Sequence, residues 1–249
     1  MIILKSRREI ERIKAASRIV AEVLEGLRSL VVPGISTYDL DRYAADAAHK
    51  RNARCAFRGY NKYPNSLCCS PNDQVVHGLA NKSQLKSGDI ISLDFGVIFD
   101  DYYGDAAITL AVGEISAEAR RLIAVTEESL YAAIKKAVPG NRLGDISSAV
   151  QEYVEGRGYS VVRDFVGHGI GKSLHEEPQI PNYGTPNKGI KLKSGMVLAI
   201  EPMINEKLHD VKVLSDNWTV VTCDGGLSAH FEHTVAITDN GPEILTQLC

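Results

Sequence analysis

Two segments of this 249-residue chain are nearly the same: "LKSGDIISLD" runs from Leu85 to Asp94, and "LKSGMVLAIE" runs from Leu192 to Glu201. They begin 107 residues apart. Each segment opens with a Lys-Ser-Gly turn, continues as an apolar run of strand type and ends on a carboxylate. The recurrence of a strand that ends in an acid predicts a duplicated structure in which the two acids have related roles.

The repeat continues on both sides of these segments. The tripeptide "VPG" occurs at 32–34 and again at 138–140. A helical pattern of apolar residues precedes each copy, and a second helical pattern follows each, at 36–53 and 143–159. Helices grouped ahead of strands favour an α+β fold. We therefore predict a single domain, residues 1–249, with two pseudo-symmetric halves of about 1–113 and 114–249. One curved, mostly antiparallel sheet would carry helices on one face.

The predicted pseudo-twofold axis brings four carboxylates together. Asp94 and Glu201 end equivalent strands, and the return strands "GDAAIT" and "FEHTVAIT" carry Asp105 and Glu232. Four ionised acids cannot share a site of low dielectric without cations, because like charges would force protonation. Two divalent metal ions resolve this conflict, and oxygen ligands suit Mn, Fe and Co and also accept Zn.

A histidine ligand is expected beside these acids. In "VGHGIGKSLHEEP" (166–178), His168 lies between two glycines, which permit the close backbone approach that a site loop needs. Four other histidines are expected to lie outside the site. Polar surroundings place two of them at the surface, and strand alternation places two on the opposite face from Glu232 or out of its reach: His49, His209, His230 and His233.

The composition narrows the class of protein. The formal net charge of −3 offers no general attraction to nucleic acid or to an anionic membrane. The sequence shows neither a signal-peptide pattern nor an apolar run long enough to span a membrane. The five cysteines are odd in number and form no C-x-x-C pair, which argues against a disulfide framework or a zinc-thiolate site: Cys55, Cys68, Cys69, Cys223 and Cys249. We expect a cytoplasmic protein.

The set Asp94, Asp105, His168, Glu201 and Glu232, with "GHGIG", "LHEEP", "LAIEP" and "FEHT" around the last three, resembles the methionine aminopeptidases. The resemblance covers essentially the whole chain and implies the pita-bread fold of that class. Only 33 residues separate His168 from Glu201. This leaves no room for the helical insertion of the second type, so the resemblance is to the compact first type of bacterial kind.

The resemblance also implies a mechanism. Two divalent ions with a bridging water or hydroxide would cleave the first peptide bond of new polypeptides that begin with Met followed by a small residue. Glu201 would act as general base and then as proton donor. His77 would lie near the α-amine and the scissile nitrogen, and His175 would hydrogen-bond to the developing oxyanion.

An apolar methionine pocket is a further implication of the resemblance, with Tyr60, Tyr63, Cys68 and Trp218 in its wall or rim. Three positions depart from the bacterial pattern. Phe57 replaces a small Cys and Leu174 replaces a Phe, changes that compensate in volume if both face one cavity. Pro71 replaces a β-branched residue before His77. The resemblance also implies a monovalent cation near Asn72 and Ser228.

Other functions of the same fold are the alternatives. An X-Pro aminopeptidase or prolidase would carry a large extra N-terminal domain and a proline pocket, and a creatinase-like enzyme would lack the metal ligands. A non-catalytic module for ribosome or nucleic-acid association would also lack them. We expect a monomer that acts on nascent polypeptides, associates transiently with the ribosome and binds neither nucleic acid nor membrane.

Overall fold

The computed structural model describes residues 2–248. Two helices precede the strands in the N-terminal part, which comprises α1 (Arg7–Leu30), α2 (Thr37–Lys50), β1 (Arg54–Cys55), the 3-10 turn η1 (Tyr60–Lys62), β2 (Cys68–Pro71), β3 (Gln74–Val76), β4 (Ile90–Phe99) and β5 (Tyr102–Ala111). The C-terminal part again begins with two helices, α3 (Ala117–Ile134) and α4 (Leu143–Glu155). Its strands are β6 (Ser160–Val161), β7 (Gly167–Gly169), β8 (Glu176–Ile180), β9 (Val197–Ile200), β10 (Met203–Asn205), β11 (Val211–Val213), β12 (Val220–Thr222), β13 (Ser228–His230), β14 (Glu232–Thr238) and β15 (Gly241–Ile244).

Serine caps begin three of the four α-helices. Ser6 forms a capping box with Glu9, and the side chains of Ser36 and Ser116 accept backbone N–H bonds from residues three positions on. The apolar residues of α1 recur at helical spacing and are buried along one face: Ile13, Val20, Leu24 and Leu27. α1, α2 and α3 therefore begin where a serine side chain caps the backbone, and α1 buries one apolar stripe.

One antiparallel sheet of nine strands joins the two parts, in the order β1-β4-β5-β14-β9-β7-β8, with β2 beside β4 and β15 beside β14. The pairing of β5 with β14 connects the N-terminal and C-terminal strands. The excursion between β9 and β14 adds two three-stranded sheets, β13-β10-β6 and β11-β12-β3. The predicted α+β pita-bread fold is confirmed.

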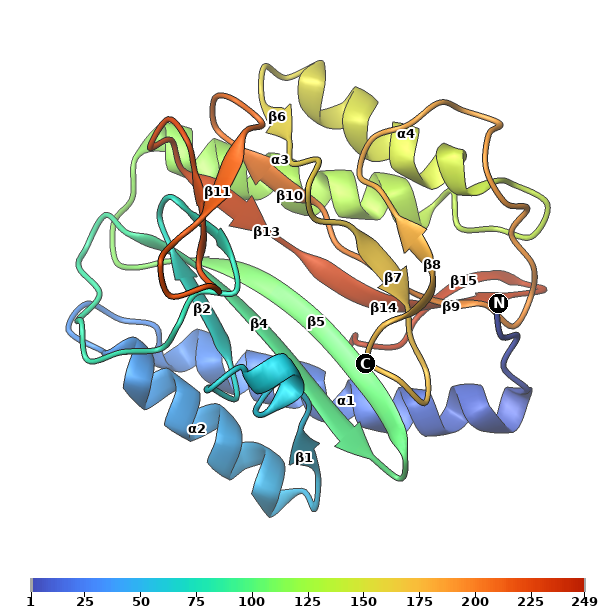
Figure 1. Ribbon diagram of the computed structural model, residues 1–249, viewed down its shortest axis with the longest axis horizontal. Helices are drawn as coiled ribbons and strands as arrows, with labels where there is room; N and C mark the ends of the chain where they lie inside the picture. Colours follow the sequence, from blue (N-terminus) through green and yellow to red (C-terminus); the bar gives the residue numbers. More distant parts are fainter. Residues whose placement is uncertain (1, 249) are drawn as a thin grey trace.

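The helices pack beside the strands of their own part of the chain. Figure 1 shows α1 and α2 along the long β4–β5 hairpin, and α3 and α4 along β6, β10 and β13. Phe95 of β4 and Ala106 of β5 are paired and belong to the core with α1 and α2. Because side chains alternate along a strand, residues 94, 105 and 107 point to the opposite face. That face carries the candidate site.

Neither a disulfide bond nor a membrane-spanning helix occurs among residues 2–248. Among residues 2–248, the thiols of Cys55, Cys68, Cys69 and Cys223 are free, and Cys249 lies outside the described residues. Within the same residues, every helix is too short or too polar to cross a bilayer.

Replacing Gly104 with alanine tests how closely β5 packs against α1. An added Cβ would lie 2.5 Å from the backbone nitrogen of Ser17 and 2.7 Å from its Cα, so the helix and strand would have to separate. We expect Gly104→Ala to lower the free energy of unfolding by about 1–3 kcal/mol in urea denaturation. Ala111→Ser, at the exposed end of the same strand, should change it by less than about 0.5 kcal/mol. Wild-type stability of Gly104→Ala would contradict this close approach.

Candidate active site

Strand register places three acids on one face of the sheet. Ala107 of β5 pairs with Asp94 of β4 on one side and with Glu232 of β14 on the other. Asp105 lies two residues before Ala107, so its side chain points to the same face. The three carboxylates therefore converge from three adjacent strands.

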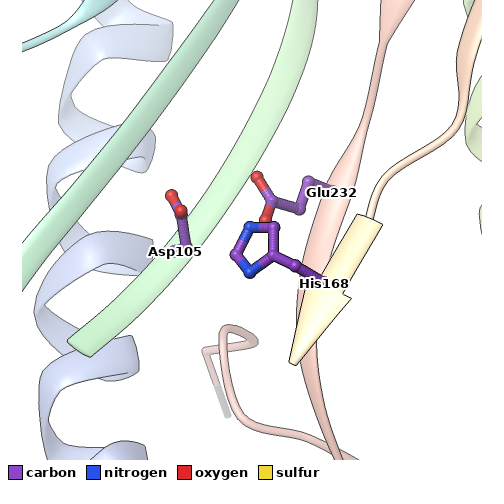
Figure 2. A group of neighbouring side chains, drawn as sticks. All are labelled: Asp105, His168 and Glu232. Carbon is purple, nitrogen blue, oxygen red and sulfur yellow. The ribbon is translucent and has the colours of Figure 1, made fainter. Parts of the chain in front are cut away.

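Glu201 and His168 join this face from the other side of β14. The pair His233–Ile200 is the last one between β14 and β9, so Glu201 comes level with Glu232 one residue further on. His168 of β7 pairs with Ala199, two residues before Glu201. Figure 2 shows the side chains of Asp105, His168 and Glu232 pointing toward one another, and one ligand atom of each lies within 4.8 Å of the others.

The acids of this group are buried and hold protons strongly. Asp105 and Glu232 are 4% and 2% exposed. Burial raises the pKa of Asp94 to about 7 and the pKa of Glu201 to about 8. Burial, followed by repulsion from neighbouring carboxylates, raises the pKa values of Asp105 and Glu232 well above their ordinary range. Burial also lowers the pKa of His168 to about 3, so this imidazole is neutral and can act as a ligand.

The donor set fits divalent cations. Three buried carboxylate oxygens have no hydrogen-bond partner within residues 2–248: Asp94 Oδ1, Asp105 Oδ1 and Glu232 Oε1. Unpartnered buried carboxylate oxygens are costly, and bound cations remove the cost. A neutral imidazole beside several carboxylates is a ligand set that Mn, Fe, Co and Zn accept.

The five residues border a cavity of about 240 Å³. All other residues predicted for the site line the same cavity, namely Tyr60, Tyr63, Cys68, His77, His175 and Trp218. Phe57 and Leu174 also line it and belong to one apolar cluster with Tyr63 and Cys68. The two departures from the bacterial pattern therefore face one cavity. Pro71 lies in β2 opposite Ile91, outside this lining.

His77 is held in a strained backbone conformation. Its φ is 59°, in the left-handed region that non-glycine residues rarely adopt. The next residue, Gly78, donates its N–H to Ser70 Oγ at 3.1 Å, and its carbonyl accepts from Tyr63 Oη at 2.8 Å. A Cβ on Gly78 would lie 2.1 Å from the carbonyl oxygen of Cys69. Burial lowers the pKa of His77 to about 4, which keeps the ring neutral.

His175 is fixed by its ring and by its loop. Its Nδ1 lies 2.7 Å from Tyr60 Oη, and its ring centroid lies 4.4 Å from that of His168. The adjacent Glu176 forms a buried ion pair with Lys5, from the segment before α1. Glu176 Oε1 also accepts from the backbone nitrogens of residues 172 and 173, at 2.9 and 3.3 Å. The loop that carries His175 is thereby tied to the N-terminal segment.

The prediction that His230 lies outside the site is wrong. The side chain of His230 is buried, and its Nε2 lies 3.5 Å from Glu201 Oε2. Residues two apart in a strand share a face, so alternation does not place His230 and Glu232 on opposite faces. Regular strand structure is also interrupted at Phe231, between β13 and β14, so alternation does not apply across this point. The exclusion of His233 agrees with the structure, since its ring nitrogens lie 2.8 Å from Thr246 Oγ1 and 3.4 Å from Tyr131 Oη.

Sequence reasoning also missed several lining residues, namely Asn61, Val76, Phe165, Val166 and Met203. Each lies within two or three residues of a predicted site residue, and this adjacency was the available signal. Asn72 and Ser228 are brought together as expected, with Ser228 N–H donating to the carbonyl of Asn72 at 2.9 Å.

Comparison with known proteins agrees with this geometry. The family model described as "Metallopeptidase family M24" matches residues 11–239. The chain is 56% identical over 250 residues to a methionine aminopeptidase of Clostridium acetobutylicum and 53% identical over 248 residues to methionine aminopeptidase 1 of Bacillus subtilis, each alignment covering 100% of both chains.

Solved structures give the same assignment at the level of the fold. A crystal structure of methionine aminopeptidase from Thermotoga maritima superposes with a TM-score of 0.98 at 48% identity and covers 100% of both chains. A prolidase from Pyrococcus horikoshii has a TM-score of 0.80 at 22% identity, over 100% of this chain and 65% of that one. The second similarity shows a shared fold.

The buried acids predict how the stability of the metal-free protein depends on pH. Between about pH 7 and pH 8, the raised pKa values let the folded state keep protons that unfolded Asp and Glu, with pKa values near 4, have released. The free energy of unfolding should therefore fall as pH rises, by about 1.4 kcal/mol per pH unit for each proton retained. Below about pH 6.5 the buried neutral histidines oppose this trend, because they bind protons on unfolding.

Urea denaturation of chelator-treated protein checks this dependence. The double variant Asp94→Asn/Glu201→Gln is the control, and it should show a shallower slope because two of the retained protons are removed. If the free energy of unfolding of the metal-free wild type rose between about pH 7 and pH 8, this prediction would be wrong.

Proposed function

The chain belongs to metallopeptidase family M24 and, within it, to the methionine aminopeptidases, and we propose that it removes the N-terminal methionine from new polypeptides whose second residue is small. The observation that carries this proposal is the convergence of four carboxylates and one imidazole at a cavity lined by aromatic, thiol and histidine side chains. A metallopeptidase needs a divalent metal centre beside a pocket for the residue that it removes.

We assign two divalent ions, Co, Mn, Fe or Zn, to Asp94, Asp105, His168, Glu201 and Glu232. When bound, such ions polarise the carbonyl of the scissile bond and lower the pKa of a water nucleophile. The unpartnered oxygens of Asp94, Asp105 and Glu232 support this assignment, because they have the free lone pairs that ligation requires.

Glu201 is the proposed proton carrier. Its side chain is 13% exposed, lines the cavity and lies level with Glu232 across the sheet. The carboxylate would accept a proton from the attacking water and then deliver it to the leaving nitrogen. Burial raises the pKa of Glu201 to about 8, so its ionised carboxylate is a stronger base than that of an ordinary Glu and can hold the accepted proton until it passes to the leaving nitrogen.

His175 is the proposed donor to the oxyanion. If Tyr60 Oη donates to Nδ1, the proton of the neutral imidazole is left on Nε2. From there it can donate to the carbonyl oxygen as negative charge develops. His77, neutral and held by the Gly78 contacts, lines the same cavity and would bind near the α-amine and the scissile nitrogen.

The methionine side chain would occupy the part of the cavity near Tyr63, Cys68 and Trp218, with Tyr60 at its rim. The Tyr63 and Trp218 rings meet edge to face with centroids 5.0 Å apart, a polarisable wall that suits a thioether. The ring of Phe57 lies close to Gly96, where an added Cβ would be 2.8 Å from the ring. The glycine therefore leaves the space that the phenylalanine ring occupies.

The proposal also covers the domain organisation, the location, the partners and a monovalent cation. Residues 1–249 would act as one catalytic domain with halves of about 1–113 and 114–249. The protein would work as a cytoplasmic monomer on nascent chains and associate transiently with the ribosome. A monovalent cation would bind near Asn72 and Ser228, where the backbone of Asn72 has a φ of 56°.

Peptide hydrolysis tests the proposed function. Metal-free protein supplied anaerobically with Mn, Co, Fe or Zn should release methionine from Met-Ala-Ser and leave Ala-Pro and Ala-Pro-Ala intact. Glu232→Ala should lose turnover and metal binding together, because a ligand is removed. Cleavage of only the proline peptides would instead assign a prolidase-type activity.

The variant His175→Ala separates chemistry from metal binding. It should bind metal as the wild type does, in isothermal titration calorimetry, while kcat on Met-Ala-Ser falls by about 10²–10³-fold, the loss expected for one oxyanion donor. Normal turnover by this variant would remove His175 from the mechanism.

A further inference from the structure

His230 lies beside the carboxylate of Glu201. Its side chain is 1% exposed, and it is absent from the residues that line the cavity. His230 Nε2 lies 3.5 Å from Glu201 Oε2, while His168 Nε2 lies 3.6 Å from Glu201 Oε1. The two oxygens of one carboxylate are therefore each approached by an imidazole, Oε1 by His168 and Oε2 by His230.

The nitrogen of His230 that approaches Glu201 lacks another partner. His230 Nε2 forms no hydrogen bond with any group in residues 2–248. A buried polar nitrogen without a hydrogen-bond partner is unfavourable. A small rotation would bring Nε2 within hydrogen-bond distance of Glu201 Oε2, and an N–H donor there would satisfy both atoms.

The backbone of His230 is fixed independently of Glu201. Its N–H donates to Thr109 Oγ1 at 2.9 Å, and the same hydroxyl donates to its carbonyl at 2.7 Å. In the β10–β13 pair, His230 lies opposite Met203. A side chain anchored in this way can hold a neighbouring carboxylate, since its own position does not depend on that carboxylate.

We propose that His230 is a positioning residue for Glu201: its Nε2–H donates to Oε2 and thereby keeps Oε1 directed toward His168 and the other ligands. The role of Glu201 in this statement rests on the proposed function, but the hydrogen bond does not. A ligating carboxylate that loses such an outer hydrogen bond binds metal or turns over substrate about 10–100-fold less well.

The first test reads the hydrogen bond without metal or substrate. Long-range ¹H–¹⁵N spectra of the metal-free protein report which ring nitrogen of His230 carries the proton, and the signal is assigned by its loss in His230→Gln. The spectra are recorded above the Glu201 pKa of about 8, so that its carboxylate is ionised and can only accept. We expect the proton on Nε2, with slow exchange in the wild type and fast exchange in Glu201→Ala. A proton on Nδ1 would overturn the proposal.

The second test compares three variants that retain wild-type circular dichroism. His230→Leu removes the donor, and it should lower kcat on Met-Ala-Ser and the affinity for Mn²⁺, measured by calorimetry, by about 10–100-fold with little change in KM. His230→Gln keeps an N–H donor and should stay within about threefold of wild type. The control is His233→Gln, at a half-buried histidine on the other face of the sheet, and this variant should also stay within about threefold.

The outcomes separate this proposal from the proposed function. If the wild type fails to cleave Met-Ala-Ser with every metal, the proposed function fails, while the tautomer and the Mn²⁺ affinities still decide the role of His230. Wild-type affinity and turnover in His230→Leu would overturn the proposal, as would an equal loss in His230→Gln. If His230→Leu does not fold, the tautomer and the glutamine variant decide.

Discussion

Four carboxylates buried on one face of one sheet impose the main constraint on this molecule. Without cations, burial and mutual repulsion hold their pKa values far above those of free acids, as they do for Asp105 and Glu232. Without cations, such a group destabilises the fold, and it offers the oxygen ligands that divalent metal ions need. The site is therefore best understood as a binding centre whose cost is offset by its cations.

The sheet supplies the geometry for this centre. Two register pairs, Ala107 with Asp94 and Ala107 with Glu232, align these acids in one row, and strand alternation adds Asp105 to the same face. The pairing of β14 with β9 then brings Glu201 level with Glu232. The same alternation places the small residues Gly104 and Ala106 against α1, so the helices cover one face and leave the other for chemistry. A slip of one residue in any of these strands would bury an acid against a helix.

Much of this arrangement could be predicted from the sequence, because duplication makes equivalent residues visible. The matching segments 85–94 and 192–201 indicated the α+β fold and the four acids, and flanking glycines indicated His168. The expectation that both strands end on their acid was wrong for Asp94, because β4 continues to Phe99. His230 could not be placed, since its strand ends one residue before Phe231 and its contact with Glu201 depends on how β13 and β14 diverge. Phe165 and Met203 lie within three residues of His168 and Glu201, but which neighbours of a ligand face the cavity depends on how these segments meet in the folded chain. For the pocket, the family resemblance supplied what periodicity did not.

We propose that five side chains from β4, β5, β7, β14 and the residue after β9 together enclose two cations. The most direct measurement is the anomalous difference density of crystals soaked in Mn²⁺, recorded at a wavelength where manganese scatters anomalously. The account predicts two peaks among the side-chain oxygens and the imidazole nitrogen of these residues. Density confined to surface carboxylates, with none inside this group, would contradict it.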